Sequence, residues 1–319
     1  MVPAVVVRVY DGPLPAEAVS CFQEGAGAAL TFAGLVRPLE DGRLILALDY
    51  EVYEPMARRV LEELAGEMLQ THELLGIAVE HSRGRVGVGE CSFRLQIAAP
   101  HRQEALAAMA EFIKSMKRDV PIWKNVCPLR TLAAILAGGL AARLGGTAKG
   151  LLPIPQGTII ERLLAELASA AIDDVIIVAN DPQPYAALGK TTIGDLRPRV
   201  GPLGGIEAAL SYAGDAYDAV LVLPCDLPNV SATEIRRLLN VFARDPRRAA
   251  VAVTPDGRQH PLCAVAPVTL LPQVVQSIEA GQYGVGRLWT ALAAATVPVA
   301  DPTKLYNINT PQDLNQLPT

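Results

Sequence analysis

Two lysines near the middle of the chain have the spacing of a small reactive site. Lys117 comes late in a predicted helix within EFIKSMKRDVPIWK (111–124), and Pro121 ends that helix so that the chain can bring Lys124 back toward Lys117. Cations clustered beside apolar walls bind phosphate. They also make an amine easier to deprotonate, because like charges repel and burial disfavours charge, so one lysine can serve as a base or nucleophile. Solvated helix residues are the alternative interpretation, and spacing alone leaves both open.

Three further basic residues upstream could complete this site. Arg37 ends the predicted strand ALTFAGLVR, and His101 and Arg102 follow the predicted strand CSFRLQIAA. Together with the two lysines they would suit an anionic small molecule. The pair at 101–102 could instead cap the helix that follows it.

A second candidate site is the glycine-rich stretch ILAGGLAARLGGTAKGLL (135–152). Glycines such as Gly138 and Gly139 let the backbone approach a phosphate chain, and N–H groups at a helix start favour anions. Arg143 and Lys149 would supply positive charge for a polyphosphate leaving group. The stretch matches neither GxxxxGK[ST] nor GxGxxG, so a plain strand-to-helix turn is the alternative.

An aspartate further along could belong to the same site. Asp226 ends the apolar run AVLVLPCD (219–226), which reads as a buried strand. Open α/β sheets bind ligands at the carboxyl ends of their strands, and a carboxylate there suits Mg²⁺, which keeps waters and bridges substrate phosphates. The alternative is a turn or helix cap, helped by Pro228.

The elements that must position these residues fall into two series. In the first, strands and helices are mixed without a regular rhythm, and EDGR (40–43) is typical of a turn between two strands. From about residue 132, short buried strands alternate with helices, which predicts a largely parallel sheet covered on both faces. We therefore expect an α+β domain over residues 1–128 and a three-layer, Rossmann-like α/β domain over residues 129–319. The strands expected in the first domain are 4–10, 29–37, 44–53 and 91–99, and its helices are 54–75 and 103–116.

Bulk properties exclude several classes of protein. The chain has 319 residues, half of them hydrophobic, and a net charge of −5, which argues against a general binder of nucleic acid or of a membrane surface. Its five cysteines are widely spaced, as buried thiols in a reducing compartment would be. No signal-peptide pattern and no apolar run of membrane-spanning length is present, so we expect a soluble, cytoplasmic protein.

The first series resembles the catalytic (large) subunit of molybdopterin synthase. The resemblance runs over about residues 1–125 and rests on TFAGLVR, LDYEVYEPMA, HSRGRVGVGE, the His-Arg pair at 101–102 and KRDVPIWK, in that order. It implies transfer of two sulfurs into a cyclic pyranopterin monophosphate, which gives the dithiolene of molybdopterin. The sulfur arrives as a thiocarboxylate on the C-terminal Gly-Gly tail of a small ubiquitin-like sulfur-carrier subunit. It also implies a homodimer through this domain, with each site drawing on both copies.

Site residues are carried over by the same resemblance. Lys117 is then the catalytic lysine, and Lys124 helps to hold the substrate and the tail of the partner. The phosphorylated pterin is bound by Arg37, His101 and Arg102, with the backbone near Leu35 and Val36 close by. The family continues well past its Trp-Lys motif, whereas here Asn125 and Val126 lead directly into the next domain.

The second series, over about residues 131–319, resembles the molybdenum cofactor guanylyltransferases, within the nucleotidyltransferase superfamily. It rests on LAGGLAARLGGTAKGLL, VAN (178–180), GPLGGI (201–206), LPCDLP (223–228), QHP (259–261) and YNINTPQDL (306–314). The implied reaction transfers GMP from GTP to the terminal phosphate of molybdopterin and releases pyrophosphate. Asp226 would hold Mg²⁺, and Asn307 and Asn309 would lie toward the pterin. The residues expected to bind GTP are Leu136, Ala137, Gly138, Gly139, Arg143, Lys149, Asn180, Asp195 and Asp226.

The two resemblances together predict a bifunctional transferase of molybdenum cofactor biosynthesis. Ala148 stands before Lys149 where the guanylyltransferase family often has an aspartate. This departure and the short tail after Lys124 leave a second hypothesis open, in which one domain is a non-catalytic docking module. A third hypothesis keeps the enzyme but exchanges GTP for CTP.

Overall fold

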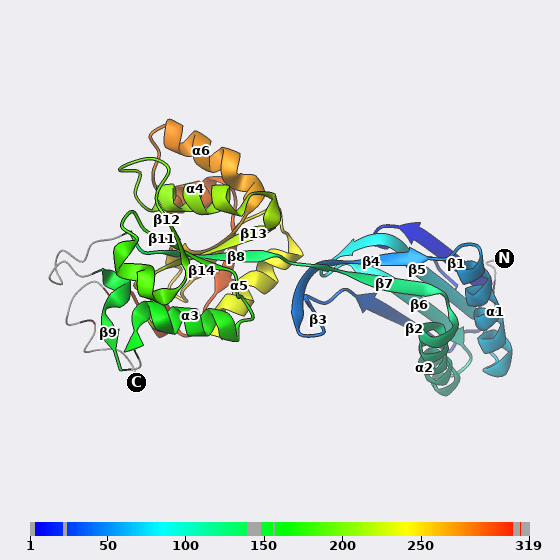
Figure 1. Cartoon of the computed structure of the whole chain (residues 1–319). Helices are drawn as coiled ribbons and strands as arrows, with labels where there is room; N and C mark the ends of the chain where they lie inside the picture. The colour runs from blue at the N-terminus through cyan, green and yellow to red at the C-terminus, as the bar shows by residue number, and fades with distance from the viewer. Residues whose placement is uncertain (1–3, 22–23, 139–147, 156, 309–312, 314–319) are drawn as a thin grey trace. The chain divides into compact units, whose positions relative to one another are not determined.

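The computed structural model describes residues 4–21, 24–138, 148–155, 157–308 and 313 of the chain. The chain divides into two compact units, Met1–Pro128 and Leu129–Thr319, and each is described by itself below (Figure 1). Across the described residues, every helix is too short or too polar to cross a membrane. The five cysteines, all within the described ranges, are unpaired thiols.

Unit 1 is built on one mixed sheet of seven strands. Five of them run in the spatial order β2-β6-β5-β4-β3, with β1 parallel to β5 and β7 antiparallel to β4. Two helices complete the unit, α1 (Met56–Thr71) and α2 (Arg102–Asp119). The strands are β1 (Val5–Asp11), β2 (Ala28–Leu35), β3 (Leu39–Glu40), β4 (Arg43–Val52), β5 (Gly76–Gly87), β6 (Cys91–Ala99) and β7 (Ile122–Pro128).

Both helices of unit 1 pack on one face of this sheet. Helix α1 buries Leu61 and Met68 at helical spacing, and α2 buries Phe112, all in one core with the β5 and β6 side chains. Each large apolar side chain removed from water contributes about 1.5–3 kcal/mol, so this contact holds α2 in place on the sheet. The end of α2 carries Lys117, one residue after the buried Met116.

The expected α+β character of this domain is confirmed, with three strands that the sequence pattern did not reveal. Strands β3 and β5 were not predicted, and the segment after Pro121 was expected only to bend back toward Lys117. It forms β7 instead, which pairs along β4 and sets Lys124 opposite Tyr50. The EDGR turn is confirmed as the β3–β4 hairpin, where Asp41 and Gly42 both have positive φ, as a type I′ turn requires.

Unit 2 is a three-layer α/β unit around a seven-stranded sheet. The strand order is β12-β11-β8-β13-β15-β14-β16, and β12, β11, β8 and β13 are mutually parallel. The predicted largely parallel sheet is confirmed, although β15 runs antiparallel to both of its neighbours. The strands are β8 (Thr131–Leu136), β11 (Val175–Val178), β12 (Thr191–Ile193), β13 (Ala219–Pro224), β14 (Ala250–Val253), β15 (Gln259–Pro267) and β16 (Ala295–Pro298).

Helices cover both faces of this sheet, as the alternation of strands and helices predicts. Helices α4, α6 and α7 share one apolar core with β8, β11 and β13, and α3 and α5 lie on the other side (Figure 1). A small pair of strands, β9 (Pro153–Ile154) and β10 (Gly157–Thr158), precedes α3. The helices are α3 (Ile159–Ser169), α4 (Pro202–Ala213), α5 (Ala232–Arg244), α6 (Leu271–Glu279) and α7 (Val285–Ala291).

Candidate active sites

A cavity of about 480 Å³ in unit 1 gathers most of the basic residues that the sequence singled out. We call it the lysine cavity. Arg37 enters it just after β2, Lys117 from the end of α2 and Lys124 from β7. Its walls are largely apolar, with Leu48, Phe93 and Met116 among them, which is the setting in which clustered cations hold an anion. The predicted convergence of the two lysines on one site is therefore seen in the geometry.

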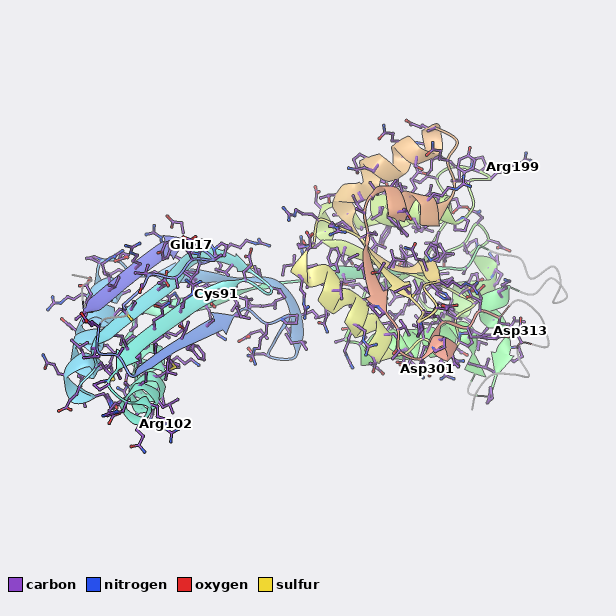
Figure 2. The ribbon with its side chains drawn as sticks, turned by 180° about the vertical axis from the view of Figure 1, so that it is seen from behind. Glu17, Cys91, Arg102, Arg199, Asp301 and Asp313 are labelled. Atoms are coloured by element: carbon purple, nitrogen blue, oxygen red, sulfur yellow. The ribbon has the colours of Figure 1, made fainter. Side chains whose placement is uncertain are left out.

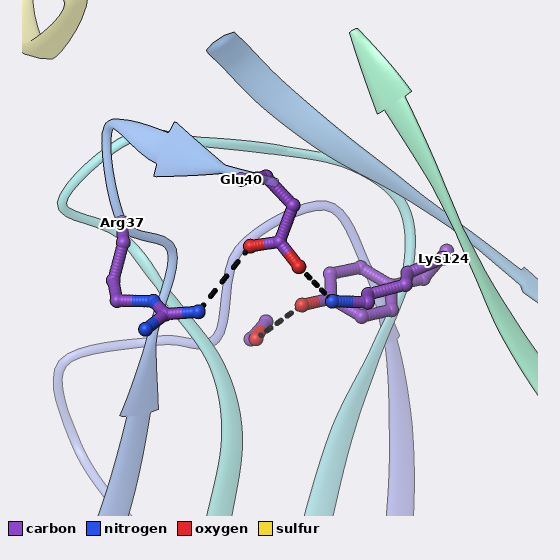
Figure 3. Close-up of polar contacts among 5 residues, drawn as sticks. Arg37, Glu40 and Lys124 are labelled. Carbon is purple, nitrogen blue, oxygen red and sulfur yellow. Dashed lines mark hydrogen bonds and ion pairs between the residues drawn. The ribbon is translucent and has the colours of Figure 1, made fainter. Parts of the chain in front are cut away.

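One acidic residue that the sequence analysis did not assign lies between two of these cations. Glu40, at the end of β3, is 8% exposed, accepts a hydrogen bond from Lys124 Nζ, and lies 3.5 Å from Arg37 Nη2 (Figure 3). The hydrogen bond from Lys124 holds the pKa of the Glu40 carboxyl below its usual value of 4.5, with a further contribution from Arg37. Glu40 is therefore a carboxylate at neutral pH, with one oxygen on each cation.

Two aromatic side chains form a neutral wall of the lysine cavity. The Tyr50 hydroxyl donates to Ser92 Oγ at 2.9 Å, and its ring meets His81 edge-on at a centroid distance of 5.3 Å. Burial raises the pKa of Tyr50 and lowers that of His81, so both favour their uncharged forms. The His81 Nδ1 atom lies 2.8 Å from the Ser82 carbonyl oxygen, to which neutral imidazole can donate its proton. These residues shape the cavity while the lysines and Arg37 supply its positive charge.

His101 and Arg102 do not line this cavity. They begin α2, whereas Lys117 lies roughly four helical turns further on, about 22 Å at 1.5 Å per residue. Both are exposed, as Figure 2 shows for Arg102. His101 occupies the N-cap position, but its ring makes no capping hydrogen bond within the described residues. Within a single copy of the chain, these two residues and the two lysines therefore cannot contact one small ligand.

Of the other two predicted residues of this site, one lines the cavity and the other does not. Leu35 lines it and is 58% exposed, while Val36 is buried at 3%. The Val36 backbone is tied on both sides, donating to the Glu90 carbonyl at 3.0 Å and accepting from Gly89 N–H at 2.8 Å. These two hydrogen bonds fix the backbone just before Arg37, beyond the end of β2.

A second cavity, of about 310 Å³, lies in unit 2 at the carboxyl ends of parallel strands. We call it the aspartate cavity. Leu136 and Gly138 reach it from the end of β8, Asp195 follows β12, and Asp226 follows β13. Lys149, from the last part of the glycine-rich stretch, completes it. The site therefore lies where open α/β sheets bind their ligands.

The start of α4 forms one wall of this cavity. Gly201 has a φ of 76° at the N-cap, a conformation that strains residues other than glycine, and Pro202 follows at the first helical position. Gly205 lets the helix come close to the sheet, since a Cβ there would lie 3.1 Å from Leu136 Cδ2. The first N–H groups of a helix lack partners within the helix and attract anions.

Asp226 is held by two side chains from distant parts of the sequence. Asn307 Nδ2 donates to one carboxylate oxygen at 2.8 Å, and Lys149 Nζ lies 3.5 Å from the other. Asn307 also lines an adjoining cavity of about 370 Å³, which we call the arginine cavity. Its other lining residues include Arg258, His260 and Tyr306, none of which the sequence analysis assigned a role. His260 lies in the quoted QHP motif, and burial, followed by the charge of Arg258, lowers its pKa.

The remaining predicted residues of the second site support it or lie outside the described ranges. The Asn180 side chain donates a hydrogen bond to the Asp195 carboxylate. Ala137 is buried, and its backbone N–H donates to the Val178 carbonyl at 2.8 Å. Gly139, Arg143 and Asn309 fall outside the described residues. The helix expected after the glycines falls largely on residues outside the described ranges, and where the description resumes, Lys149–Leu151 form a short 3₁₀ turn.

Comparison with known proteins assigns each unit to a family. Residues 11–119 match the family described as MoaE protein, and residues 133–296, about half of the chain, match the MobA-like NTP transferase domain. The molybdopterin synthase catalytic subunit of a Nostoc species is 36% identical over 116 residues, covering 35% of this chain and 70% of that protein. The molybdenum cofactor guanylyltransferase of Vibrio campbellii is 32% identical over 192 residues, covering 59% of this chain and 95% of that protein. The chain belongs to both families.

A solved structure from Archaeoglobus fulgidus, titled molybdopterin-guanine dinucleotide biosynthesis protein A, covers 58% of this chain and 95% of that chain, at 22% identity and a TM-score of 0.49. The two family matches and the two relatives named above confirm both predicted families, in the predicted order along the chain. Relatives of both units carry the names of enzymes, so the assignment to the enzyme class is also confirmed.

The donor atoms of the aspartate cavity suit one kind of metal ion. Among the described residues, no three His, Cys, Asp or Glu side chains gather as a metal-binding group. Asp195 and Asp226 nonetheless line the same cavity. Mg²⁺ is usually held by only one or two carboxylates, together with waters and substrate phosphates. The residues present therefore fit Mg²⁺ carried with a nucleotide and do not resemble a site for a soft or tightly caged metal.

Proposed function

We propose that the chain is a bifunctional enzyme of molybdenum cofactor biosynthesis with one independent site in each unit. Unit 1 would transfer sulfur from a thiocarboxylated small subunit to cyclic pyranopterin monophosphate. Unit 2 would transfer GMP from GTP to the phosphate of molybdopterin. The observation that carries the proposal is the pair of cavities, one cationic and one with carboxylates, each within a unit that belongs to the matching family.

In unit 1, the lysine cavity is suited to hold two anions at once. Arg37 and Lys124 would neutralise the phosphate of the pterin, and Lys117 would face the reacting end of the partner's tail. A Gly-Gly tail is narrow enough to enter a cavity of this size, because it carries no side chains. Neutral Tyr50 and His81 would keep the wall polar without adding charge.

The active form of unit 1 would be a homodimer. His101 and Arg102 lie too far along α2 to reach a ligand held by Lys117 of the same copy. If they bind the same pterin, a second copy of the chain must bring them. A closed twofold dimer would supply each site with Lys117 and Lys124 from one copy and the pair at 101–102 from the other.

In unit 2, nucleotide and acceptor would occupy adjoining cavities. The aspartate cavity would take GTP, with the start of α4 and Lys149 facing its phosphates. Asp226, with Asp195 nearby, would hold Mg²⁺, which when bound supplies positive charge to the triphosphate. The arginine cavity would take molybdopterin on the other side of the Asp226–Asn307 pair. Positioning and charge neutralisation are the main requirements of such a phosphoryl-group transfer.

A single coupled reaction tests this function. The full-length protein is incubated with thiocarboxylated small subunit, cyclic pyranopterin monophosphate, molybdate and either Mg-GTP or Mg-CTP, and the products are identified by mass. We expect molybdopterin without nucleotide, and a guanine dinucleotide form with GTP. Formation of a cytosine dinucleotide instead would exclude the guanylyl assignment. Absence of molybdopterin with all sulfur-transfer components present would exclude the function of unit 1.

A further inference from the structure

We propose that Glu40 is an internal competitor for the anion-binding cations of the lysine cavity. Its carboxylate bridges Arg37 and Lys124, contributing one oxygen to each (Figure 3). A phosphate or a terminal carboxylate would engage a guanidinium and an ammonium group in the same way. Glu40 therefore occupies the position that an anionic ligand would take, and such a ligand must displace it.

The charges that line the cavity indicate that Glu40 competes with anionic ligands and does more than hold the two cations in place. Three cations line it, Arg37, Lys117 and Lys124, and among the described lining residues Glu40 carries the only carboxylate. His81 contributes no compensating positive charge, because burial favours its neutral form. Glu40 thus lowers the attraction for every incoming anion and leaves Lys117 as the lining cation it does not engage.

Glu40 is buried at the cavity, but few backbone pairings hold it there. It ends β3, a strand of two residues whose pairing with β4 is limited to the hairpin positions Leu39–Leu44 and Glu40–Arg43. The Arg37 side chain is 76% exposed and the Lys124 side chain 53% exposed, so an incoming anion can reach both cations, and rotation of the Glu40 side chain, itself 9% exposed, would release them. A ligand that offers a stronger anion would drive this exchange. Glu40 would thereby favour phosphate-bearing ligands, which displace it more easily, over carboxylates that bind weakly.

Binding of inorganic phosphate to the full-length protein tests the proposal by titration calorimetry. We expect Glu40→Gln to bind phosphate roughly three- to tenfold more tightly than the wild type, because glutamine removes the competing charge and keeps the side-chain volume. A merely structural role for Glu40 would not produce a gain in affinity. Affinity in Glu40→Gln equal to or weaker than that of the wild type would overturn the proposal.

Two further variants locate the effect. Asp41→Asn removes one negative charge from the adjoining turn, outside the cavity lining, and asparagine tolerates the positive φ at this position, so phosphate affinity should stay at the wild-type value. Adding Lys124→Ala to Glu40→Gln should abolish the gain, which separates the lysine cavity from any phosphate bound in unit 2. A gain of equal size in Asp41→Asn, or one that survives Lys124→Ala, would contradict direct competition.

This inference deepens the proposed function of unit 1, but its test requires no sulfur transfer. Tighter phosphate binding by Glu40→Gln in a protein that makes no molybdopterin would refute the proposed function alone. Active sulfur transfer without the gain in affinity would refute the competition alone.

Discussion

Asn180 and Asp195 hold each other through two hydrogen bonds of opposite direction. Asn180 Nδ2 donates to the Asp195 carboxylate at 3.0 Å, and the Asp195 backbone N–H donates to Asn180 Oδ1 at 2.8 Å. Asn180→Asp would set two carboxylates face to face, and their repulsion would displace Asp195 from the aspartate cavity. We expect Mg-GTP affinity, measured by calorimetry, to fall about tenfold or more.

The matched control for this change is Asn180→Ala. Alanine removes both hydrogen bonds without adding charge, so it should weaken nucleotide binding less than aspartate does. Equal losses in the two variants would show that the hydrogen bonds matter and the repulsion does not. Wild-type affinity in Asn180→Asp would rule out any role for Asp195 in holding the nucleotide.

The two sites should fail independently. Lys117→Ala is expected to abolish formation of molybdopterin, since the lysine cavity loses its proposed catalytic amine, while GMP transfer to supplied cofactor persists. Asp226→Ala should do the reverse, because it removes the carboxylate proposed to hold Mg²⁺. Both activities are read by product mass on each folded variant. Loss of both activities in both variants, with unchanged thermal unfolding, would refute a model with two separate sites.

A mixed-dimer experiment tests whether the unit 1 site is shared between copies. Lys117→Ala and Arg102→Ala should each be inactive in sulfur transfer if both residues serve one site. After co-refolding in equal amounts, half of the dimers are mixed, and each mixed dimer has one intact site of two. We therefore expect sulfur transfer to recover to about a quarter of the wild-type rate. No recovery despite verified exchange of subunits would show that the two copies do not share one site through Lys117 and Arg102.

The sequence indicated which residues belong to the candidate sites better than it indicated which side chains those residues contact. Lys117 and Lys124 were expected to converge because a proline separates them, and they do line one cavity, although a strand paired with β4 brings Lys124 there. Glu40 could not be placed from sequence, since its contact with Lys124 spans 84 positions and depends on the β3–β4 hairpin. Asn307 and Asp226, 81 positions apart, were assigned by family resemblance, whereas their direct bond is visible only in the fold.

Hydrophobic patterning predicted most of the architecture, and the two strands β7 and β15 show where it could not. Strand β7, IWKNVCP, is mostly exposed and lacks the alternation that predicts a half-buried strand. Strand β15 is antiparallel because only a short turn separates it from β14, and a parallel partner needs a crossover of about a dozen residues or more. The Asp256-Gly257 pair, with Gly257 at a φ of 82°, is the turn signal that could have predicted this hairpin.

The stability of unit 1 should depend on the protonation of His81. Burial lowers the pKa of His81 below its usual value of 6.5, so below that pH the unfolded chain binds a proton that the folded chain resists. Stability is then fully retained above pH 6.5 and is lost as the pH falls toward the lower pKa of the folded state. The steepest loss that one such group can cause is about 1.4 kcal/mol per pH unit. The lowered pKa of Glu40 acts in the same direction, but only below about pH 4.5.

Urea unfolding between pH 6.5 and 5 therefore isolates His81 from Glu40. The two tryptophans are Trp123 in unit 1 and Trp289 in unit 2, so a Trp289→Phe background reports unit 1 through Trp123 fluorescence. Adding His81→Phe keeps a ring against Tyr50 and Phe93 but removes the titrating group. We expect the free energy of unfolding to fall less steeply with decreasing pH in this variant than in its parent. Parallel pH dependences in the two proteins would mean that His81 titrates normally in the fold, despite its burial at 5% exposure.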